Sequence, residues 1–412
     1  MKAAVDAQRL SQELETLAGF SDAPAPAVTR IVFTEADRRA RRYFKERCES
    51  AGLAVREDAA GNTFARWKGT SPEAPAVASG SHTDAIPNAG RFDGTVGVFG
   101  ALEAVRTLQA SGFQPRRSID VVMFTSEEPT LFGIGCLGSR LMAGSLDGDA
   151  GERLHDGDGR TLNEVRAAAG FNGALSAVRI HEDAYAAFVE LHIEQGPLLE
   201  REGDDIGVVT AIAAPASLRV FVEGPGGHAG AVLMPDRHDA FLAAAEIALA
   251  VEAAATGSGS TDTVATVGVC EVFPGAINSV PSRVRIEIDA RDIDLDRRDR
   301  VLAQITAACR DLAFGRGVSV RQEPINADPP ASCSPELVTT IAKACADRGF
   351  RHRLMISRAY HDSLFMARVA PTAMVFVPCR GGVSHRPDEF TSPEAIAKGV
   401  VVLADTLAML AS

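Results

Sequence analysis

The sequence predicts an α/β protein in which a split domain with a mostly parallel sheet carries an inserted ferredoxin-like domain, with the element order β-α-β-β-α-β. Three observations lead to this prediction. Strand-like apolar runs alternate with helical segments up to about residue 207, the same pattern returns after about residue 330, and the residues between them follow a different order. The length of 412 residues favours two domains, because domains usually hold about 100–200 residues.

The outer blocks are defined by short apolar runs separated by segments of helical periodicity. In the first block we expect strands at 76–81, 119–124 and 188–191 and a helix at 95–108. In the last block we expect a helix at 334–348, a strand at 372–377 and a helix at 393–410. Strands that alternate with helices are typical of a parallel sheet covered by helices.

The middle block predicts the inserted domain. We expect strands at 218–222, 263–270, 284–288 and 318–321, and helices at 236–255 and 297–313. The flanking segments 213–217 and 323–336 are expected to be loops, the second because it contains four prolines. The predicted boundaries are therefore 1–210 and 327–412 for the split domain and 211–326 for the inserted one.

Composition excludes several classes of protein. With 46% hydrophobic and 23% charged residues the chain is globular, and no apolar run is long enough to span a membrane. The net charge of −12 argues against a nucleic-acid partner. No signal peptide is expected at the N-terminus, and the seven scattered cysteines form no C-x-x-C pair. We therefore expect reduced thiols and a cytoplasmic protein.

Three histidines stand at the ends of predicted strands. His82 and His192 directly follow apolar runs, and His385 follows another after a short glycine-rich loop. Taken singly, a histidine at a strand end is more often a hydrogen-bonded loop residue, and we assign the remaining candidates to that class: His155, His181, His238 and His352. The joint placement of the first three is the argument for a ligand site, because ligands bind outside the carboxyl ends of parallel strands.

Carboxylates accompany these histidines. Glu127 and Glu128 follow the strand at 119–124, and Asp93 precedes the helix at 95–108. The alternative for the glutamate pair is a solvated acidic loop. Imidazole and carboxylate together suit zinc, manganese or cobalt rather than calcium.

Two glycine-rich segments were candidates for phosphate or nucleotide binding. Residues 133–138 match G-x-G-x-x-G, but an acidic loop separates them from the preceding strand, which argues against a dinucleotide site. Residues 224–230 lack the Lys-Ser/Thr of a phosphate loop and are interpreted as a tight loop that presents His228.

Eight ordered motifs carry a resemblance to a known family. They are GSHTD, GRFDGTVGV, FTSEEPTLFG, ELHIEQGP, GGHAG, INSVP, DARD and GVSHRPDE. The chain resembles, over essentially its whole length, the M20-type dinuclear metal amidohydrolases, which include N-carbamoyl-L-amino acid, allantoate and ureidoglycolate amidohydrolases. The resemblance implies two divalent metal ions, a catalytic domain split by a lid that also mediates dimerisation, and a homodimer.

The resemblance also implies roles for the strand-end residues. His82 is similar to a ligand of one metal, with Asp84 steadying its ring, and Asp93 to the carboxylate that bridges both metals. Glu128 is similar to a ligand of the second metal and Glu127 to the general base. The set is completed by two further ligands, His192 and His385.

Residues for substrate are implied in the same way. His228 resembles a residue that reaches the partner subunit's site and stabilises the oxyanion, and Gln195 a polar contact near the metals. Asn278 and Arg291 resemble the residues that bind a substrate carboxylate. Without its motif, Arg291 would be read as an ordinary surface charge.

Two departures from the commoner family pattern narrow the substrate. Tyr360 replaces a glycine in the loop that also holds His361, and a phenol there favours a small, polar substrate unless it only packs under the lid. The second departure is EEPTLFG in place of the commoner EEG-x-RFG. Within that segment, Leu131 departs from the ureidoglycolate subgroup as well, for which an arginine is expected there. The loops that hold both residues resemble those of the ureidoglycolate amidohydrolases, a subgroup associated with manganese.

The expected reaction is therefore hydrolysis of (S)-ureidoglycolate, a small carboxylate, to glyoxylate, ammonia and carbon dioxide. Zinc or cobalt in place of manganese stays open, since the ligand types do not select among them. The alternatives are a related M20 hydrolase of an N-carbamoyl or N-acyl amino acid or a small aromatic amine, and a catalytically silent binding protein on the same fold. The silent protein would be expected to lack a ligand or the base.

Overall fold

The computed structural model describes residues 4–412 and divides into two compact units. Unit 1 comprises residues up to Thr210 together with Ser332–Ser357 and His361–Ser412. Unit 2 comprises Ala211–Ala331 and the short segment Arg358–Tyr360. Within the described residues, none of the helices combines the length and apolar character that crossing a lipid bilayer requires.

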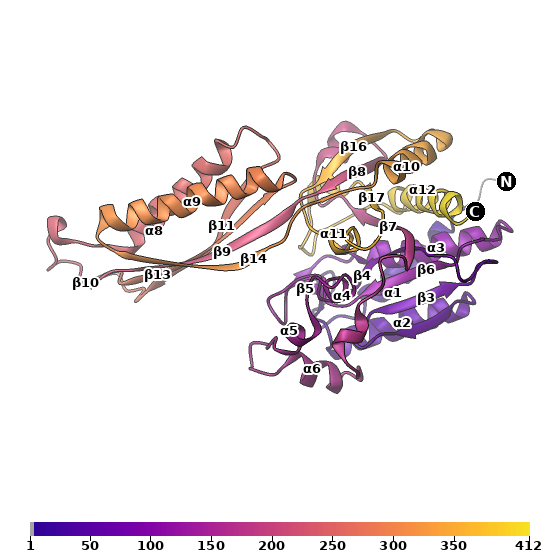
Figure 1. The fold of residues 1–412 in the computed structure, drawn as a ribbon, viewed down its shortest axis with the longest axis horizontal. Helices are drawn as coiled ribbons and strands as arrows, with labels where there is room; N and C mark the ends of the chain where they lie inside the picture. Colours follow the sequence, from indigo (N-terminus) through magenta and orange to yellow (C-terminus); the bar gives the residue numbers. More distant parts are fainter. Residues whose placement is uncertain (1–3) are drawn as a thin grey trace. The chain divides into compact units, whose positions relative to one another are not determined.

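Unit 1 is built on a large mixed sheet (Figure 1) with the strand order β15-β8-β17-β7-β4-β6-β3-β2, and β16 pairs with β8. Its central strands β17 (Thr372–Val377), β7 (Tyr185–Ile193), β4 (Ala76–His82) and β6 (Ile119–Phe124) are parallel to one another. These four strands form the parallel centre of the sheet that we expected. The outer strands β8 (Ile206–Ile212), β3 (Thr63–Trp67) and β2 (Ala54–Glu57) run antiparallel to their inner neighbours.

Helices cover the central strands. Strands β4 and β6 are buried along their whole length, as expected for parallel strands covered on both faces. Helices α3 (Thr95–Ala110) and α12 (Pro393–Ala411) pack against each other and against these strands. The other helices of unit 1 with ten or more residues are α1 (Ala7–Ala18), α2 (Glu35–Ser50) and α10 (Pro335–Arg348).

The carboxyl ends of the central strands meet at one edge of the sheet. His82 pairs with Phe124 at the ends of β4 and β6, and Phe376 pairs with His192 at the ends of β17 and β7. The loops that follow these strands therefore start next to one another, which is where open α/β sheets bind ligands.

Unit 2 has the predicted β-α-β-β-α-β order. Strands β9 (Ala214–Glu223), β11 (Val264–Phe273), β13 (Arg283–Asp292) and β14 (Ser319–Ala327) form an antiparallel sheet in the order β11-β13-β9-β14. Helices α8 (Ala240–Thr256) and α9 (Leu295–Arg316) lie along the same face of this sheet (Figure 1). Burial alternates along β13, since only one face of an antiparallel sheet is covered. A short pair, β10 (Gly227–His228) and β12 (Ser279–Val280), was not predicted.

The entry flank that we expected to be a loop belongs largely to a strand, and residues 323–327 and 331–332 of the exit flank are also strand. Strand β9 begins at Ala214, so the entry segment 213–217 is strand rather than loop. Strand β14 continues through Pro324 to Ala327. A proline is tolerated there because β14 lies at the edge of the sheet, where its missing N–H leaves no neighbouring strand unpaired, and the register shifts next to the proline.

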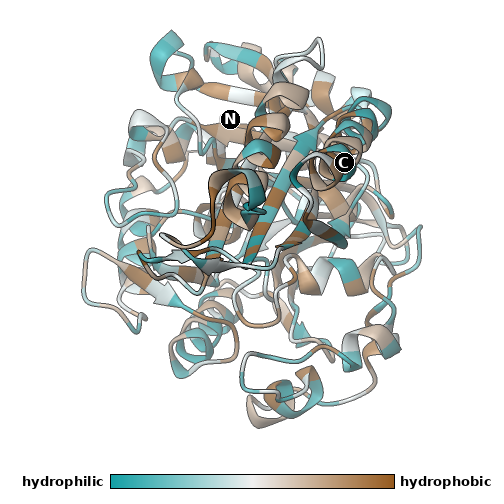
Figure 2. Cartoon of the chain, turned by 90° about the vertical axis from the view of Figure 1, so that its left-hand side faces the viewer, coloured by the Kyte–Doolittle hydropathy of each residue, from teal (hydrophilic) through white to brown (hydrophobic). Residues whose placement is uncertain are grey.

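Hydrophobic and hydrophilic residues alternate along the strands and helices of the chain (Figure 2).

Candidate metal centre

Three histidines lie at the carboxyl edge of the unit 1 sheet. His82 is the last residue of β4, His192 is the penultimate residue of β7, and His385 lies in the loop after β17. His82 and His192 are buried, whereas the side chain of His385 is 46% exposed. The backbone of His385 has a φ of 59°, which turns the loop sharply at this residue.

Asp93 lies between these histidines and faces them with both carboxylate oxygens. Its Oδ1 is 3.2 Å from Nε2 of His192 and 3.9 Å from Nε2 of His82. Its Oδ2 is 3.1 Å from Nε2 of His385. Asp93 is thus shared by two groups of candidate ligands whose donor atoms lie within 4.8 Å of one another: His82, Asp93 and His192, and Asp93, Glu128 and His385.

The two adjacent glutamates point to different histidines. Oε1 of Glu128 is 3.3 Å from Nε2 of His385, and Oε2 of Glu127 is 3.7 Å from Nε2 of His82. Asp84 holds the loop that carries them, because its carboxylate accepts the backbone N–H groups of Glu127 at 3.3 Å and Glu128 at 3.0 Å. Glu127 belongs to neither of the two ligand groups around Asp93.

Asp84 also lies against the ring of His82, mainly through its backbone. Nδ1 of His82 is 3.0 Å from the carbonyl oxygen of Asp84 and 3.6 Å from its carboxylate. A backbone carbonyl at Nδ1 leaves Nε2 as the nitrogen that can bind a ligand.

A glycine directly before α3 allows the start of this helix to approach the end of β4 closely. Gly94 has a φ of +65°, and a Cβ placed there would lie 2.4 Å from Nε2 of His82. No side chain can therefore stand at this position without displacing the ring.

Gln195 contacts the shared carboxylate directly. Its Nε2 donates to Oδ2 of Asp93 at 2.8 Å and to Oγ of Ser384 at 3.2 Å. Its φ is 56°, and its Oε1 is buried without a hydrogen-bond partner in the described part of the chain. An unsatisfied buried oxygen beside this cluster is a further acceptor available to a ligand.

The histidines and carboxylates shift one another's pKa values. Hydrogen bonds to Asp93 and Glu128 raise the pKa of His385 to about 11. Burial acts to lower the pKa of His192, but its hydrogen bond to Asp93 outweighs burial and raises that pKa to about 9. Burial acts to raise the pKa of Asp93, but its hydrogen bonds with His192 and His385 outweigh burial and hold that pKa well below its usual range. Positive charge between these carboxylates is strongly favoured, so the donor set fits divalent cations.

Glu127 behaves differently from the ligand candidates. Burial, with the charge of Glu128 next, raises the pKa of Glu127 well above its usual value. A buried carboxyl group with a raised pKa is suited to take up and release a proton during a reaction.

Two residues of the site were missed by the sequence analysis as individual candidates. Glu389 accepts the backbone N–H groups of Phe92 at 2.8 Å and Asp93 at 3.1 Å, and also the hydroxyl of Ser384 at 3.0 Å. It stands four residues after His385 in the GVSHRPDE motif, which was the available signal. Glu190 lies on the same face of β7 as His192, a signal of period two, and accepts the Ser81 hydroxyl at 2.6 Å.

His361 lies beside the cluster in unit 1. Its ring centroid is 4.5 Å from that of His192, and its Nε2 is 3.0 Å from Oγ of Ser357. With Glu190 and His192 it forms a third group of potential ligands. Leu131, found where an arginine was expected, packs partly buried against the core cluster of Phe124 and its neighbours.

The remaining predicted residues lie in unit 2. The guanidinium carbon of Arg291 is 5.8 Å from the centroid of the Tyr360 ring, and its Nε donates to Asp289 at 2.7 Å. His228 is exposed in β10, paired with Ser279, which follows Asn278.

Asn278 and Arg291 lie at opposite ends of the unit 2 sheet. Arg283 pairs with the end of β9, beyond which the β10–β12 pair lies, whereas Arg291 pairs with Pro215 near its start. The eight residue steps from position 283 to position 291 span roughly 27 Å of strand. Within one chain, Asn278 and Arg291 do not bind the same carboxylate.

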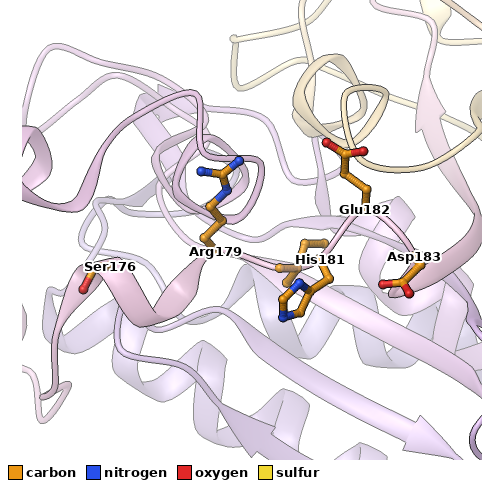
Figure 3. Close-up of a pocket in the computed structure, with 6 residues that line it drawn as sticks. Ser176, Arg179, His181, Glu182 and Asp183 are labelled. Atoms are coloured by element: carbon orange, nitrogen blue, oxygen red, sulfur yellow. The ribbon is translucent and has the colours of Figure 1, made fainter.

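Figure 3 shows a separate cavity of about 620 Å³. It is lined by Ser176, Arg179, Ile180, His181, Glu182 and Asp183. These residues precede β7, whose far end carries His192, so the cavity lies at the opposite end of that strand from the candidate ligands.

The fold and the site together define a class of protein: an α/β enzyme with a metal centre at the carboxyl edge of its sheet. The sequence profile described as "Peptidase family M20/M25/M40" matches residues 78–409. The chain belongs to this family.

Several relatives and solved structures are similar to this chain over nearly its whole length. Ureidoglycolate hydrolase of Arabidopsis thaliana is 54% identical, with 98% of this chain and 87% of the relative covered. N-carbamoyl-L-amino acid amidohydrolase of Geobacillus stearothermophilus is 38% identical, with 99% of each covered. The crystal structure of AtUAH in complex with glyoxylate has a TM-score of 0.92 and 53% identity, covering 100% of this chain and 99% of the other.

Proposed function

We propose that this protein hydrolyses (S)-ureidoglycolate to ammonia, carbon dioxide and glyoxylate in the cytoplasm. The observation that carries the reaction class is the Asp93 carboxylate shared between two groups of candidate metal ligands. The substrate is supported by the 54% identity to a ureidoglycolate hydrolase and by a similar solved structure in complex with (S)-hydroxyglycine, which is 52% identical. The cytoplasm is proposed because all seven cysteines are free and six are buried.

Two divalent cations are part of this proposal. One would be held by His82, Asp93 and His192, and the second by Asp93, Glu128 and His385. Manganese is proposed on the resemblance to the ureidoglycolate subgroup, since imidazole and carboxylate ligands also accept zinc and cobalt. When bound, such cations polarise a carbonyl oxygen and lower the pKa of water.

Glu127 is the proposed general base. It is buried beside His82 and is not a member of the ligand groups around Asp93. In the proposed reaction Glu127 takes a proton from the water that adds to the ureido carbonyl. It then gives that proton to the nitrogen that leaves as ammonia when the C–N bond breaks. The carbamate that remains loses carbon dioxide to give hydroxyglycine, which decomposes to glyoxylate and a second ammonia.

Unit 2 supplies the proposed substrate contacts. Arg291 binds the substrate carboxylate through its planar fork, with Tyr360 beside it. His228 and Asn278, at the other end of the unit 2 sheet, are proposed to act in the site of a second subunit. Their separation from Arg291 within one chain supports this division of roles.

The proposed assembly is a homodimer formed by unit 2, which would also serve as the lid. Strand β11 is an edge strand that is exposed along most of its ten residues, and such an edge pairs readily with another strand. Helix α8, which packs next to β11, exposes Phe241, Leu242 and Leu249 by 42%, 38% and 65%. An exposed apolar surface beside an open strand edge fits a second copy of the same surface.

The test is ammonia release by manganese-loaded protein given (S)-ureidoglycolate, allantoate and N-carbamoyl-alanine side by side. We expect preference for ureidoglycolate, and strong turnover of N-carbamoyl-alanine with none of ureidoglycolate would overturn the proposed substrate. The variant Glu127→Gln should lose turnover while keeping its manganese. Glu73→Gln, at an exposed position, is the matched control and should match the wild type.

A further inference from the structure

Cys136 has an unusual backbone conformation next to the proposed general base. It is fully buried directly before α4 (Leu137–Met142), with φ 55° and ψ 37°. Residues with a side chain rarely adopt this left-handed conformation, which glycine adopts easily.

The loop that carries Glu127 holds Cys136 in this conformation. The backbone N–H of Cys136 donates to the carbonyl oxygen of Glu127 at 2.7 Å. The carbonyl oxygen of Cys136 accepts the backbone N–H of Arg140 at 2.8 Å and the hydroxyl of Ser139 at 3.2 Å. Strained conformations persist where several such bonds impose them, and they concentrate at functional sites.

The thiol of Cys136 points at the carboxylate of the same glutamate. Sγ donates to Oε1 of Glu127 at 3.5 Å, while Oε2 faces Nε2 of His82 at 3.7 Å. In the part of the chain that the structure describes, this thiol is the one hydrogen-bond donor to the Glu127 carboxylate. Burial raises the pKa of the thiol well above its usual value, so the sulfur keeps its proton and can donate it to a hydrogen bond.

We propose that Cys136 is a positioning residue for the reaction, whose thiol holds the Glu127 carboxylate in the orientation that proton transfer requires. This inference rests on the proposed function, because it takes Glu127 as the base. A thiol is a weak donor, so it fixes the direction of the side chain while leaving the carboxylate available to accept a proton. Cys136 itself touches no substrate in this role.

The competing explanation is that Cys136 only fills space beside Glu127. Two substitutions separate the alternatives. Cys136→Ala keeps the backbone and removes the donor, whereas Cys136→Ser keeps a donor on a side chain of similar size. A packing role predicts similar losses for both variants, and a positioning role predicts rescue by serine.

The experiment measures kcat, KM, manganese content and thermal stability of the intact manganese-loaded protein. For Cys136→Ala we expect kcat to fall about tenfold with KM and manganese content unchanged, the pattern of a group needed for the chemical step. Cys136→Ser is expected to stay within about threefold of the wild type. Cys345→Ala is the matched control, since that buried thiol lies in α10, and its kcat should not change.

A double-mutant cycle ties the effect to the base. In a Glu127→Asp background the shorter carboxylate no longer reaches the thiol, so Cys136→Ala should cost little further activity. Equal losses in both backgrounds, an unchanged kcat for Cys136→Ala, or equal losses for alanine and serine would overturn the inference. If Glu127→Gln is fully active, the role of Glu127 fails first, which distinguishes failure of the proposed function from failure of this step.

Discussion

Glu389 and Asp93 stand 296 positions apart in the chain, and the Glu389 carboxylate accepts the backbone N–H of Asp93 at 3.1 Å. The same oxygen accepts the N–H of Phe92, and the other oxygen accepts the hydroxyl of Ser384. The same Ser384 hydroxyl lies 2.8 Å from Oδ2 of Asp93, so its single proton is shared between the two carboxylates. Glu389 therefore fixes both the backbone and the carboxylate of the residue shared by the two ligand groups.

Removing these acceptors should weaken metal binding. For Glu389→Leu we expect manganese affinity to fall about 10- to 100-fold, as for other residues that orient metal ligands, with a smaller loss for Glu389→Gln, which keeps one acceptor. Titration calorimetry with manganese measures this directly. Glu394→Gln, in the exposed first turn of α12, is the control, and equal affinities for all variants would contradict the prediction.

A methyl group at Gly94 should disrupt the site more than the fold. Gly94→Ala places a Cβ 2.4 Å from Nε2 of His82 at a φ of +65°. Gly112→Ala also introduces a side chain at a positive φ, +80°, with nothing within 4 Å of the new carbon. Gly112→Ala should lose roughly 1–2 kcal/mol of stability from the backbone, read from thermal unfolding. Gly94→Ala should lose more, because its φ of 65° and ψ of −42° lie outside the left-handed helical region. Only Gly94→Ala should lose manganese binding, and retention of normal affinity there would refute the prediction.

Metal affinity should rise with pH. Without metal, the pKa of His192 is raised to about 9 and that of His385 to about 11, so both rings carry protons at neutral pH. A cation must displace these protons, and raising the pH toward 9 removes part of the competition. Calorimetry in two buffers of different ionisation enthalpy should show proton release at pH 7. Manganese affinity that stays constant between pH 6 and 9 would count against protonated histidines.

A charge on the exposed face of α8 should separate the subunits of the proposed dimer. Leu249→Glu places a carboxylate on a side chain that is 65% exposed in unit 2, and Leu354→Glu does the same at a side chain that is 62% exposed in unit 1. In sedimentation velocity we expect a monomer for Leu249→Glu and a dimer for Leu354→Glu. A dimer that survives Leu249→Glu at micromolar concentration would place the interface elsewhere.

The parts of the fold that followed from the sequence were those with a clear period. Strands β4, β6 and β17 are short, mostly apolar segments that are buried along their length, and α8 and α9 stand between strands in the predicted order. Helix α2 was missed because arginines dominate it, although Ala36, Ala40, Phe44 and Cys48 form a buried stripe with a spacing of four. The antiparallel outer strands could not be assigned, because pairing direction depends on tertiary neighbours rather than on period.

The site residues likewise divide into those that the sequence predicts and those that only the structure reveals. Strand ends were enough to group His82, His192 and His385, because parallel strands end at one edge. The motif GVSHRPDE contains Glu389, but its hydrogen bonds to a segment 296 positions away could not be predicted from that motif. The distance between Asn278 and Arg291 likewise follows from strand register, which only the paired structure shows.

The junction between the two parts of unit 1 is narrow. The backbone N–H of Cys333, just after the insertion, donates to the carbonyl oxygen of Thr210, just before it, at 3.0 Å. An added segment whose two ends are neighbours disturbs its host at a single point, much as domain insertions are tolerated at loop tips. The inserted unit is therefore free to diverge as an evolutionary module, changing what the enzyme accepts while the edge that carries the histidines keeps its geometry.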